Sequence, residues 1–239
     1  MGSVEIITDI VAQVPNDIIK ELGIHVVPLT IILGEENFRD GVDLPSAQLF
    51  KRMRTEDIIV QTTSPSMGDF YQLFEDRFSA GTNSVIYIGI SSSLSATFSA
   101  VQADAQLIHE EFPDKNVILY DSKLATIAQG MIAIEAARQV KQGATLEQIF
   151  SRITDVRKRV GLIATLVTLK YLERGGWIGK ASFLEGSMIQ VLPLLTIDEG
   201  GLVVPNQIIP LVQPSSARNA HIASSHLRYR CHKGGDRFP

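Results

Sequence analysis

Five short apolar segments, separated by stretches of helical periodicity, restrict the fold of this chain more than any other feature of its sequence. The segments occupy residues 5–8, 26–33, 85–90, 117–120 and 162–168. Most of them are continuously apolar, a pattern typical of strands that are buried on both faces of a sheet. Strands that alternate with helices predict an α/β fold in which a mainly parallel sheet is flanked by helices.

The stretches between these segments carry signals for helix termini. Ser66 precedes a run of apolar residues at helical spacing and is followed by Asp69, so we predict an N-cap at Ser66. An alanine-rich helix is predicted over residues 125–142. Thr145 and Gln148 then form the pattern of a capping box, which predicts another helix directly after the first.

The pattern changes near residue 160, beyond which glycines and short β-like segments replace the alternation of strands and helices. We therefore expect an N-terminal α/β domain over residues 1–160 and a smaller, partial C-terminal α/β domain over residues 161–212. The tail, residues 213–239, contains the only cysteine and three of the five histidines, and it lacks hydrophobic periodicity. We expect this tail to be disordered or to replace the authentic C-terminus.

Composition narrows the class of protein. The net charge is -4 and the isoelectric point is about 5.7, which gives no sign of a nucleic-acid-binding surface. A single cysteine excludes a disulfide framework within the chain and favours a reducing compartment. The sequence begins without a secretory signal pattern and contains no run of about 18 apolar residues that could span a bilayer. We therefore expect a cytoplasmic protein with no stable membrane insertion and at most transient contact with a membrane.

Two loops rich in hydroxyl groups are the strongest chemical signal. Residues 62–66 read Thr-Thr-Ser-Pro-Ser, and residues 91–97 read Ser-Ser-Ser-Leu-Ser-Ala-Thr. Each loop is expected to precede a helix, where free N–H groups favour an anion, and parallel sheets bind ligands beyond the carboxyl ends of their strands. A phosphate would normally recruit cations, and no lysine or arginine lies between Arg77 and Lys115. The loops therefore predict a carboxylate site, with simple helix capping as the alternative.

Three other kinds of site fit the sequence less well. The nucleophile elbow of a serine hydrolase is absent, because residues 89–93 read Gly-Ile-Ser-Ser-Ser, without the second glycine. Only His25 and His109 precede the tail, and neither has a pattern that marks a catalytic base. Nucleotide-binding glycine motifs are absent, and the cysteine and histidines of the tail have no fold around them to hold a metal ion. We therefore predict neither a metal nor a cofactor, and a serine-dependent hydrolase or acyltransferase for lipids stays the alternative, with a plain interaction module as a third.

A glycine-rich segment at residues 169–180 is the third signal. It contains Arg174 and Lys180 among the glycines. Such a segment forms either a turn on a basic surface or a loop whose arginine meets a partner or the head group of a ligand.

Taken together, these motifs resemble those of the DegV family of bacterial fatty-acid-binding proteins. The first loop is similar to the family pattern T-S-x-P-S, the second to S-S-x-L-S-G-T, and the glycine-rich segment to Y-L-x-R-G-G. The matching motifs lie at residues 38–43, 62–66, 91–97, 121–122 and 171–176. The resemblance covers about residues 4–204, with Ile10 and Trp177 as departures from the family pattern.

The resemblance implies a two-domain DegV-like fold that encloses a long-chain fatty acid in an interdomain tunnel. It implies that Thr62, Ser95 and Ser92 hold the carboxylate, and that Arg174 contacts the head group or a partner. It also implies a carrier without catalytic activity of its own, which presents the fatty acid to a fatty acid kinase for phosphorylation. No cofactor is implied beyond the bound fatty acid, and no nucleic acid.

Overall fold

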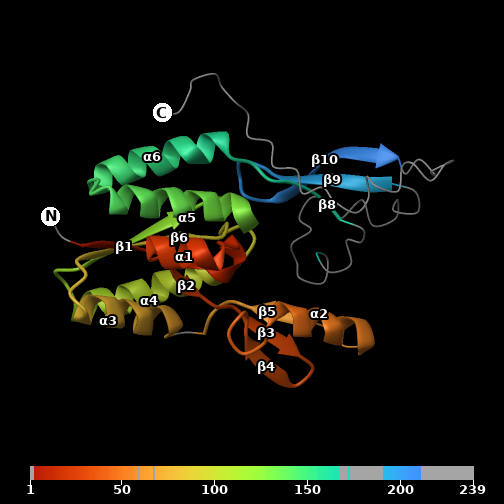
Figure 1. Ribbon diagram of the computed structural model, residues 1–239, viewed down its shortest axis with the longest axis horizontal. Coiled ribbons are helices and arrows are strands. Elements are labelled where there is room, and N and C mark those ends of the chain that lie inside the picture. Colours follow the sequence, from red (N-terminus) through yellow and green to blue (C-terminus); the bar gives the residue numbers. More distant parts are fainter. Residues whose placement is uncertain are drawn as a thin grey trace.

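The computed structural model describes residues 3–56, 58, 60–66, 68–166, 172 and 191–210. A parallel sheet forms its centre, with the strand order β2-β1-β6-β7 (Figure 1). The strands are β1 (Val4–Asp9), β2 (His25–Val27), β6 (Ser84–Gly89) and β7 (Asn116–Asp121). All three pairings in this sheet are parallel, which confirms the predicted α/β fold.

Helices cover both faces of the parallel sheet (Figure 1). Successive residues of a strand point to opposite faces, and here both sets are apolar. Ile6 and Ile88 pack against one group of helices, whereas Ile7 and Tyr87 pack against the other. The first group is α1 (Asn16–Leu22), α5 (Thr126–Lys141) and α6 (Leu146–Arg159), and the second is α3 (Asp69–Ser79) and α4 (Thr97–Glu111).

Of the two helix starts predicted from capping residues, one is confirmed and the other is wrong. The capping box of α6 is confirmed, because the Gln148 N–H donates to Thr145 Oγ1 at 3.3 Å and the Gln148 side chain accepts from the Thr145 N–H at 2.8 Å. The predicted N-cap at Ser66 is wrong, since α3 begins at Asp69 and Gly68 is its N-cap, with a φ of 99°. The buried carboxylate of Asp104, from α4, instead accepts the Gly68 N–H at 3.0 Å.

A second, antiparallel sheet projects from the parallel one, with the order β4-β3-β5. Its elements are β3 (Thr30–Leu33), β4 (Glu36–Arg39) and β5 (Val60–Thr63), together with α2 (Ser46–Thr55). The single strand predicted over residues 26–33 is therefore wrong, because β2 and β3 belong to different sheets. Pro28 lies between them and has no N–H group to continue a ladder.

A third sheet, also antiparallel, follows α6 with the order β10-β9-β8. It consists of β8 (Ile163–Thr165), β9 (Val191–Ile197) and β10 (Val203–Pro210). The expected boundary at residue 160 falls between α6 and β8. The tail over residues 213–239 lies outside the described residues, so the division into domains stays a prediction.

Candidate functional site

A cavity of about 550 Å³ lies where the three sheets meet. Val11 and Ile90, which follow the carboxyl ends of β1 and β6, form its floor, and Leu29 lines it from the link between β2 and β3. The sheet of β3, β4 and β5 contributes Thr62, and the third sheet contributes Leu195 and Val203. The volume falls within the range of small-molecule sites in proteins. Within the described part of the chain, no charged side chain lines the cavity. Its wall therefore suits an apolar ligand.

Both hydroxyl-rich loops reach this cavity. Thr62 and the two residues after it line the wall at the end of β5, and Ser95 lines it from the loop before α4. Thr62 is exposed and Ser95 is partly buried, so solvent reaches the cavity wall at both residues. The structure therefore places Thr62 and Ser95, two of the three residues to which a carboxylate role was assigned, on the wall of one cavity.

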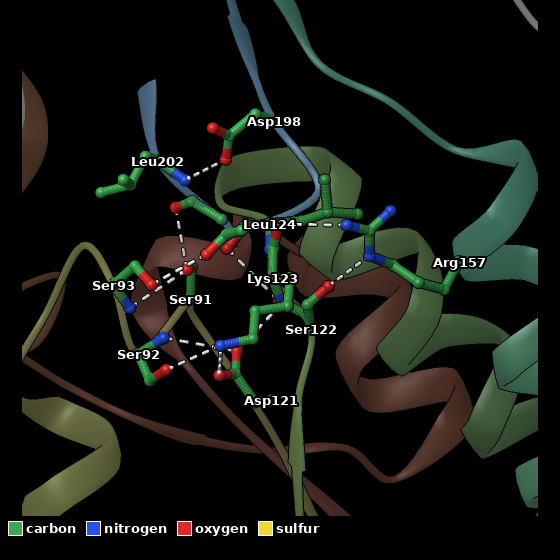
Figure 2. Close-up of polar contacts among 12 residues, drawn as sticks. Ser91, Ser92, Ser93, Asp121, Ser122, Lys123, Leu124, Arg157, Asp198 and Leu202 are labelled. Carbon is green, nitrogen blue, oxygen red and sulfur yellow. Dashed lines mark hydrogen bonds and ion pairs between the residues drawn. The ribbon is translucent and has the colours of Figure 1, made fainter. Parts of the chain in front are cut away.

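Ser92, the third of these residues, does not line the cavity. Its side-chain oxygen accepts a hydrogen bond from Lys123 Nζ at 3.0 Å, and its N–H donates to Asp121 Oδ1 at 3.3 Å (Figure 2). Burial raises the pKa of Asp121, but hydrogen bonds from Lys123 and Ser92 outweigh burial and leave this pKa below its ordinary value. The predicted absence of a cation beside the second loop is therefore wrong, because Lys123 lies next to it. Lys123 follows the neighbouring strand β7, so only the parallel pairing of β6 and β7 reveals it.

Two further serines of the second loop attach the third sheet to the parallel one. Ser91 Oγ donates to the Gly201 carbonyl at 2.9 Å, and Ser93 Oγ donates to the Gly200 carbonyl at 2.8 Å. Both glycines lie in the turn between β9 and β10. A Cβ atom at Gly201 would lie 2.1 Å from Ser91 Oγ, so the close approach requires glycine. The turn is thereby held against the loop, beside Val203 in the cavity wall.

An arginine from α6 holds the loop after β7 in the same region. Arg157 Nε donates to the Ser122 carbonyl at 2.6 Å, and its guanidinium also donates to the Lys123 carbonyl at 3.4 Å. Figure 2 shows these contacts beside those of Ser91 and Ser93. The polar cluster thus joins α6, the loop after β6, the loop after β7 and the turn of the third sheet.

A buried carboxylate supports the cavity floor from below. Asp9, which is 0% exposed, accepts hydrogen bonds from the Ile90 N–H at 3.0 Å and the Val11 N–H at 3.1 Å. Tyr87 Oη at 2.8 Å and Gln129 Nε2 at 3.0 Å donate to the same carboxylate. Burial raises the pKa of Asp9 despite these donors. Asp9 therefore orders the two residues of the floor without reaching the cavity itself.

Several predicted features lie outside the described residues or find no support within them. Arg174 and the cysteine and histidines of the tail fall outside the described ranges. Within those ranges there is no group of three or more potential metal ligands, and no helix has the length and apolar character needed to cross a membrane.

The serine hydrolase alternative would need a histidine beside the second loop. His25 instead lies 2.8 Å from Glu5, on the sheet. Among the described hydrogen bonds of residues 91–95, none involves a histidine, so nothing supports a serine hydrolase.

Comparison with known proteins yields one consistent family. The family model described as uncharacterised protein, DegV family, matches residues 3–209. A DegV domain-containing protein of Listeria innocua is 32% identical over 201 residues, which cover 84% of this chain and 70% of the relative.

Solved structures of the same family share the fold. A fatty-acid-binding DegV family protein from Thermus thermophilus superposes with a TM-score of 0.78 at 27% identity, covering 88% of this chain and 72% of that one. DegV, a fatty-acid-binding protein from Bacillus subtilis, superposes with a TM-score of 0.76 at 26% identity, covering 90% of this chain and 73% of that one. The sequence motifs, the fold and both comparisons agree, and the chain belongs to the DegV family.

Proposed function

We propose that this protein binds a long-chain fatty acid in the cavity, with the carboxylate at Thr62 and Ser95. The observation that carries the proposal is the composition of the cavity wall, which is mainly apolar, has no charged side chain among the described residues, and includes hydroxyl residues of both loops. Two solved relatives with the same fold are fatty-acid-binding proteins, which supports the same ligand class here.

The energetics of such a ligand suit this wall. Each buried methylene group contributes about 0.8 kcal/mol, so a sixteen-carbon chain gains roughly 10 kcal/mol before the costs of association. The head group then needs only hydrogen bonds that replace those it had with water, because a buried carboxylate without partners would cost several kcal/mol. Neutral hydroxyl groups near solvent meet this need.

We further propose that the protein is a carrier without catalytic activity, which presents the carboxylate to a fatty acid kinase. A carboxylate held at a solvent-facing region is accessible to a second protein, whereas the acyl chain is enclosed. The kinase would supply ATP and the catalytic groups. Arg174, to which a contact with the head group or the partner was assigned, is the residue to substitute in a test of this step.

The ligand is tested by purifying the full chain, recording its mass by native mass spectrometry, and extracting it with organic solvent. We expect an added mass that corresponds to a fatty acid, and the same acid in the extract. A folded protein that carries no lipid and binds none when fatty acid is added would contradict the proposal. A fluorophosphonate probe separates carrier from hydrolase, since we expect no labelling of residues 91–95.

The carrier role needs its own test. We expect a fatty acid kinase with ATP to form an acyl phosphate only when this protein is loaded with fatty acid. An unchanged rate without the carrier would contradict the second part of the proposal and leave fatty acid binding intact.

A further inference from the structure

One hydroxyl group of the proposed head-group site is hydrogen-bonded to a second hydroxyl group, which is buried. Ser95 Oγ and Thr97 Oγ1 lie 2.9 Å apart, and the Thr97 N–H donates to Ser95 Oγ at 3.2 Å. Ser95 lines the cavity, whereas Thr97 is 0% exposed and is not part of the cavity wall. Thr97 therefore touches the residue that faces the ligand but not the ligand itself.

The burial of Thr97 decides which of the two hydroxyls donates. A hydroxyl group has one proton and two lone pairs. If Ser95 donated, the proton of Thr97 would need another acceptor, and among the described residues Thr97 Oγ1 has no second hydrogen bond. A buried donor without an acceptor is unfavourable. The Ser95 proton, by contrast, can be accepted by water or by a ligand in the cavity. Thr97 is therefore the donor and Ser95 the acceptor.

This direction fixes what Ser95 can offer to a ligand. Both lone pairs of Ser95 Oγ are then occupied, one by the Thr97 N–H and one by the Thr97 hydroxyl. Only the proton of Ser95 remains, and it is free to point into the cavity. A carboxylate accepts hydrogen bonds and donates none, so it fits such a donor. A chain of two donors in series also polarises the second hydroxyl and strengthens its bond to an anion.

We propose that Thr97 is a positioning residue that sets Ser95 as a pure hydrogen-bond donor, and thereby makes the head-group site selective for carboxylates over alcohols of the same chain length. The proposal rests on the proposed fatty acid site. It adds a residue outside that site and a reason for head-group selectivity.

The test compares two probes that share a chain, hexadecanoic acid and hexadecan-1-ol, on the whole chain described above. Thr97→Val keeps the shape of the side chain and the N–H donor but removes the hydroxyl. We expect it to weaken binding of the acid about two- to tenfold, the effect of one hydrogen bond, and to change binding of the alcohol less than twofold. Thr97→Ser, which keeps the hydroxyl, should restore the preference for the acid.

A double-mutant cycle separates positioning from a general structural effect. In a Ser95→Ala background, Thr97→Val should have no further effect on binding of the acid, because the residue through which it acts is gone. Equal losses for acid and alcohol, a loss that persists without Ser95, or no loss at all would overturn the proposal. If Thr97→Val does not fold, Thr97→Ala serves as the variant without a hydroxyl.

Two results distinguish the fatty acid site from the role of Thr97. Wild-type protein that binds neither probe would overturn the fatty acid site, and this inference with it. Wild-type protein that binds the acid, with a Thr97→Val variant that binds it equally well, would overturn only the role of Thr97.

Discussion

Ser91 Oγ donates a hydrogen bond of 2.9 Å to the carbonyl oxygen of Gly201, although 110 residues separate the two along the chain. The bond joins the loop after β6 to the turn between β9 and β10. The same loop carries Ser95 to the cavity, with the Ser95 N–H donating to the Ser91 carbonyl at 3.2 Å. One short turn of backbone therefore holds both a wall of the cavity and the proposed head-group site.

Gly201→Ala should detach this turn. The new Cβ atom would lie 2.1 Å from Ser91 Oγ, and the φ of 82° is unfavourable for alanine. Gly34→Ala is the matched control, because Gly34 also has a positive φ, of 63°, but has open space around it. We expect the backbone cost of about 1 kcal/mol in both variants and an added loss of about 1–3 kcal/mol at Gly201, measured by urea unfolding. Equal losses would show that the close approach does not matter for stability.

Ser95→Ala should weaken binding of a free fatty acid about tenfold or more, because a hydrogen bond to a charged group is lost. Its methyl ester, which has no charge, should lose less. Ser92→Ala is the control within the same loop, since Ser92 contacts Lys123 rather than the cavity. Binding can be followed by displacement of a fluorescent fatty acid. If Ser92→Ala reduced binding as strongly as Ser95→Ala, the assignment of the head-group site to Ser95 would be wrong.

Ala164→Phe should fill part of the cavity and reduce the affinity for long acids more than for short ones. Ala164 lines the cavity from β8, whereas its neighbour Ile163 points away and is 58% exposed. Ile163→Phe adds bulk on the solvent side of the same strand and should leave binding unchanged. A series of acids of increasing length, measured by calorimetry, gives the comparison. Unchanged binding of all lengths by Ala164→Phe would place the acyl chain elsewhere.

Asp9 should make the stability of the protein depend on pH. Burial raises its pKa in the folded state above the ordinary value of 3.8. The folded protein therefore binds more protons than the unfolded one between these two values, and stability falls as the pH rises from 3.8 through the raised pKa. Asp9→Asn cannot ionise, so the part of this fall that Asp9 causes should disappear.

The measurement is the free energy of unfolding across that pH range for both proteins. Because Asp9 accepts hydrogen bonds from four donors, an asparagine amide would face some of them with a donor of its own, so we expect the variant to be less stable at each pH. The informative quantity is how the difference in unfolding free energy between the wild type and Asp9→Asn changes with pH. Parallel curves would show that Asp9 has the same pKa in both states.

The parallel sheet and its helices could be predicted from the sequence because their signals are local. Residues 85–90 are apolar without interruption, and Thr145 with Gln148 reads as a helix start whatever surrounds it. The antiparallel sheet could not be seen in the same way, because residues 26–33 are apolar on both sides of Pro28. Hydrophobic patterning indicates that a segment is buried, but it does not indicate to which sheet the segment belongs. The proline was the available signal for the break.

The kind of site could be predicted from the sequence, but the separate contact of each serine could not. Ser91, Ser92, Ser93 and Ser95 are alike in sequence, and the resemblance to a family alone singled out Ser95 and Ser92. In the structure, one serine faces the cavity, two hold a turn and one meets Lys123. These differences arise from segments that are distant along the chain, which no local pattern encodes. For the same reason the hydrogen bonds from the start of α3 to Asp104, on another helix, could not be foreseen.

The apolar cavity wall has a consequence for the stability of the protein in a cell. Apolar side chains such as Leu29, Leu195 and Val203 line it, and a fatty acid in contact with them would act as a removable part of the hydrophobic core. A ligand that binds only the folded state adds a free energy of RT ln(1 + [L]/Kd) to its stability. The ligand-free protein would then be the more easily unfolded and degraded form. The amount of this protein in a cell would then follow the supply of its proposed ligand.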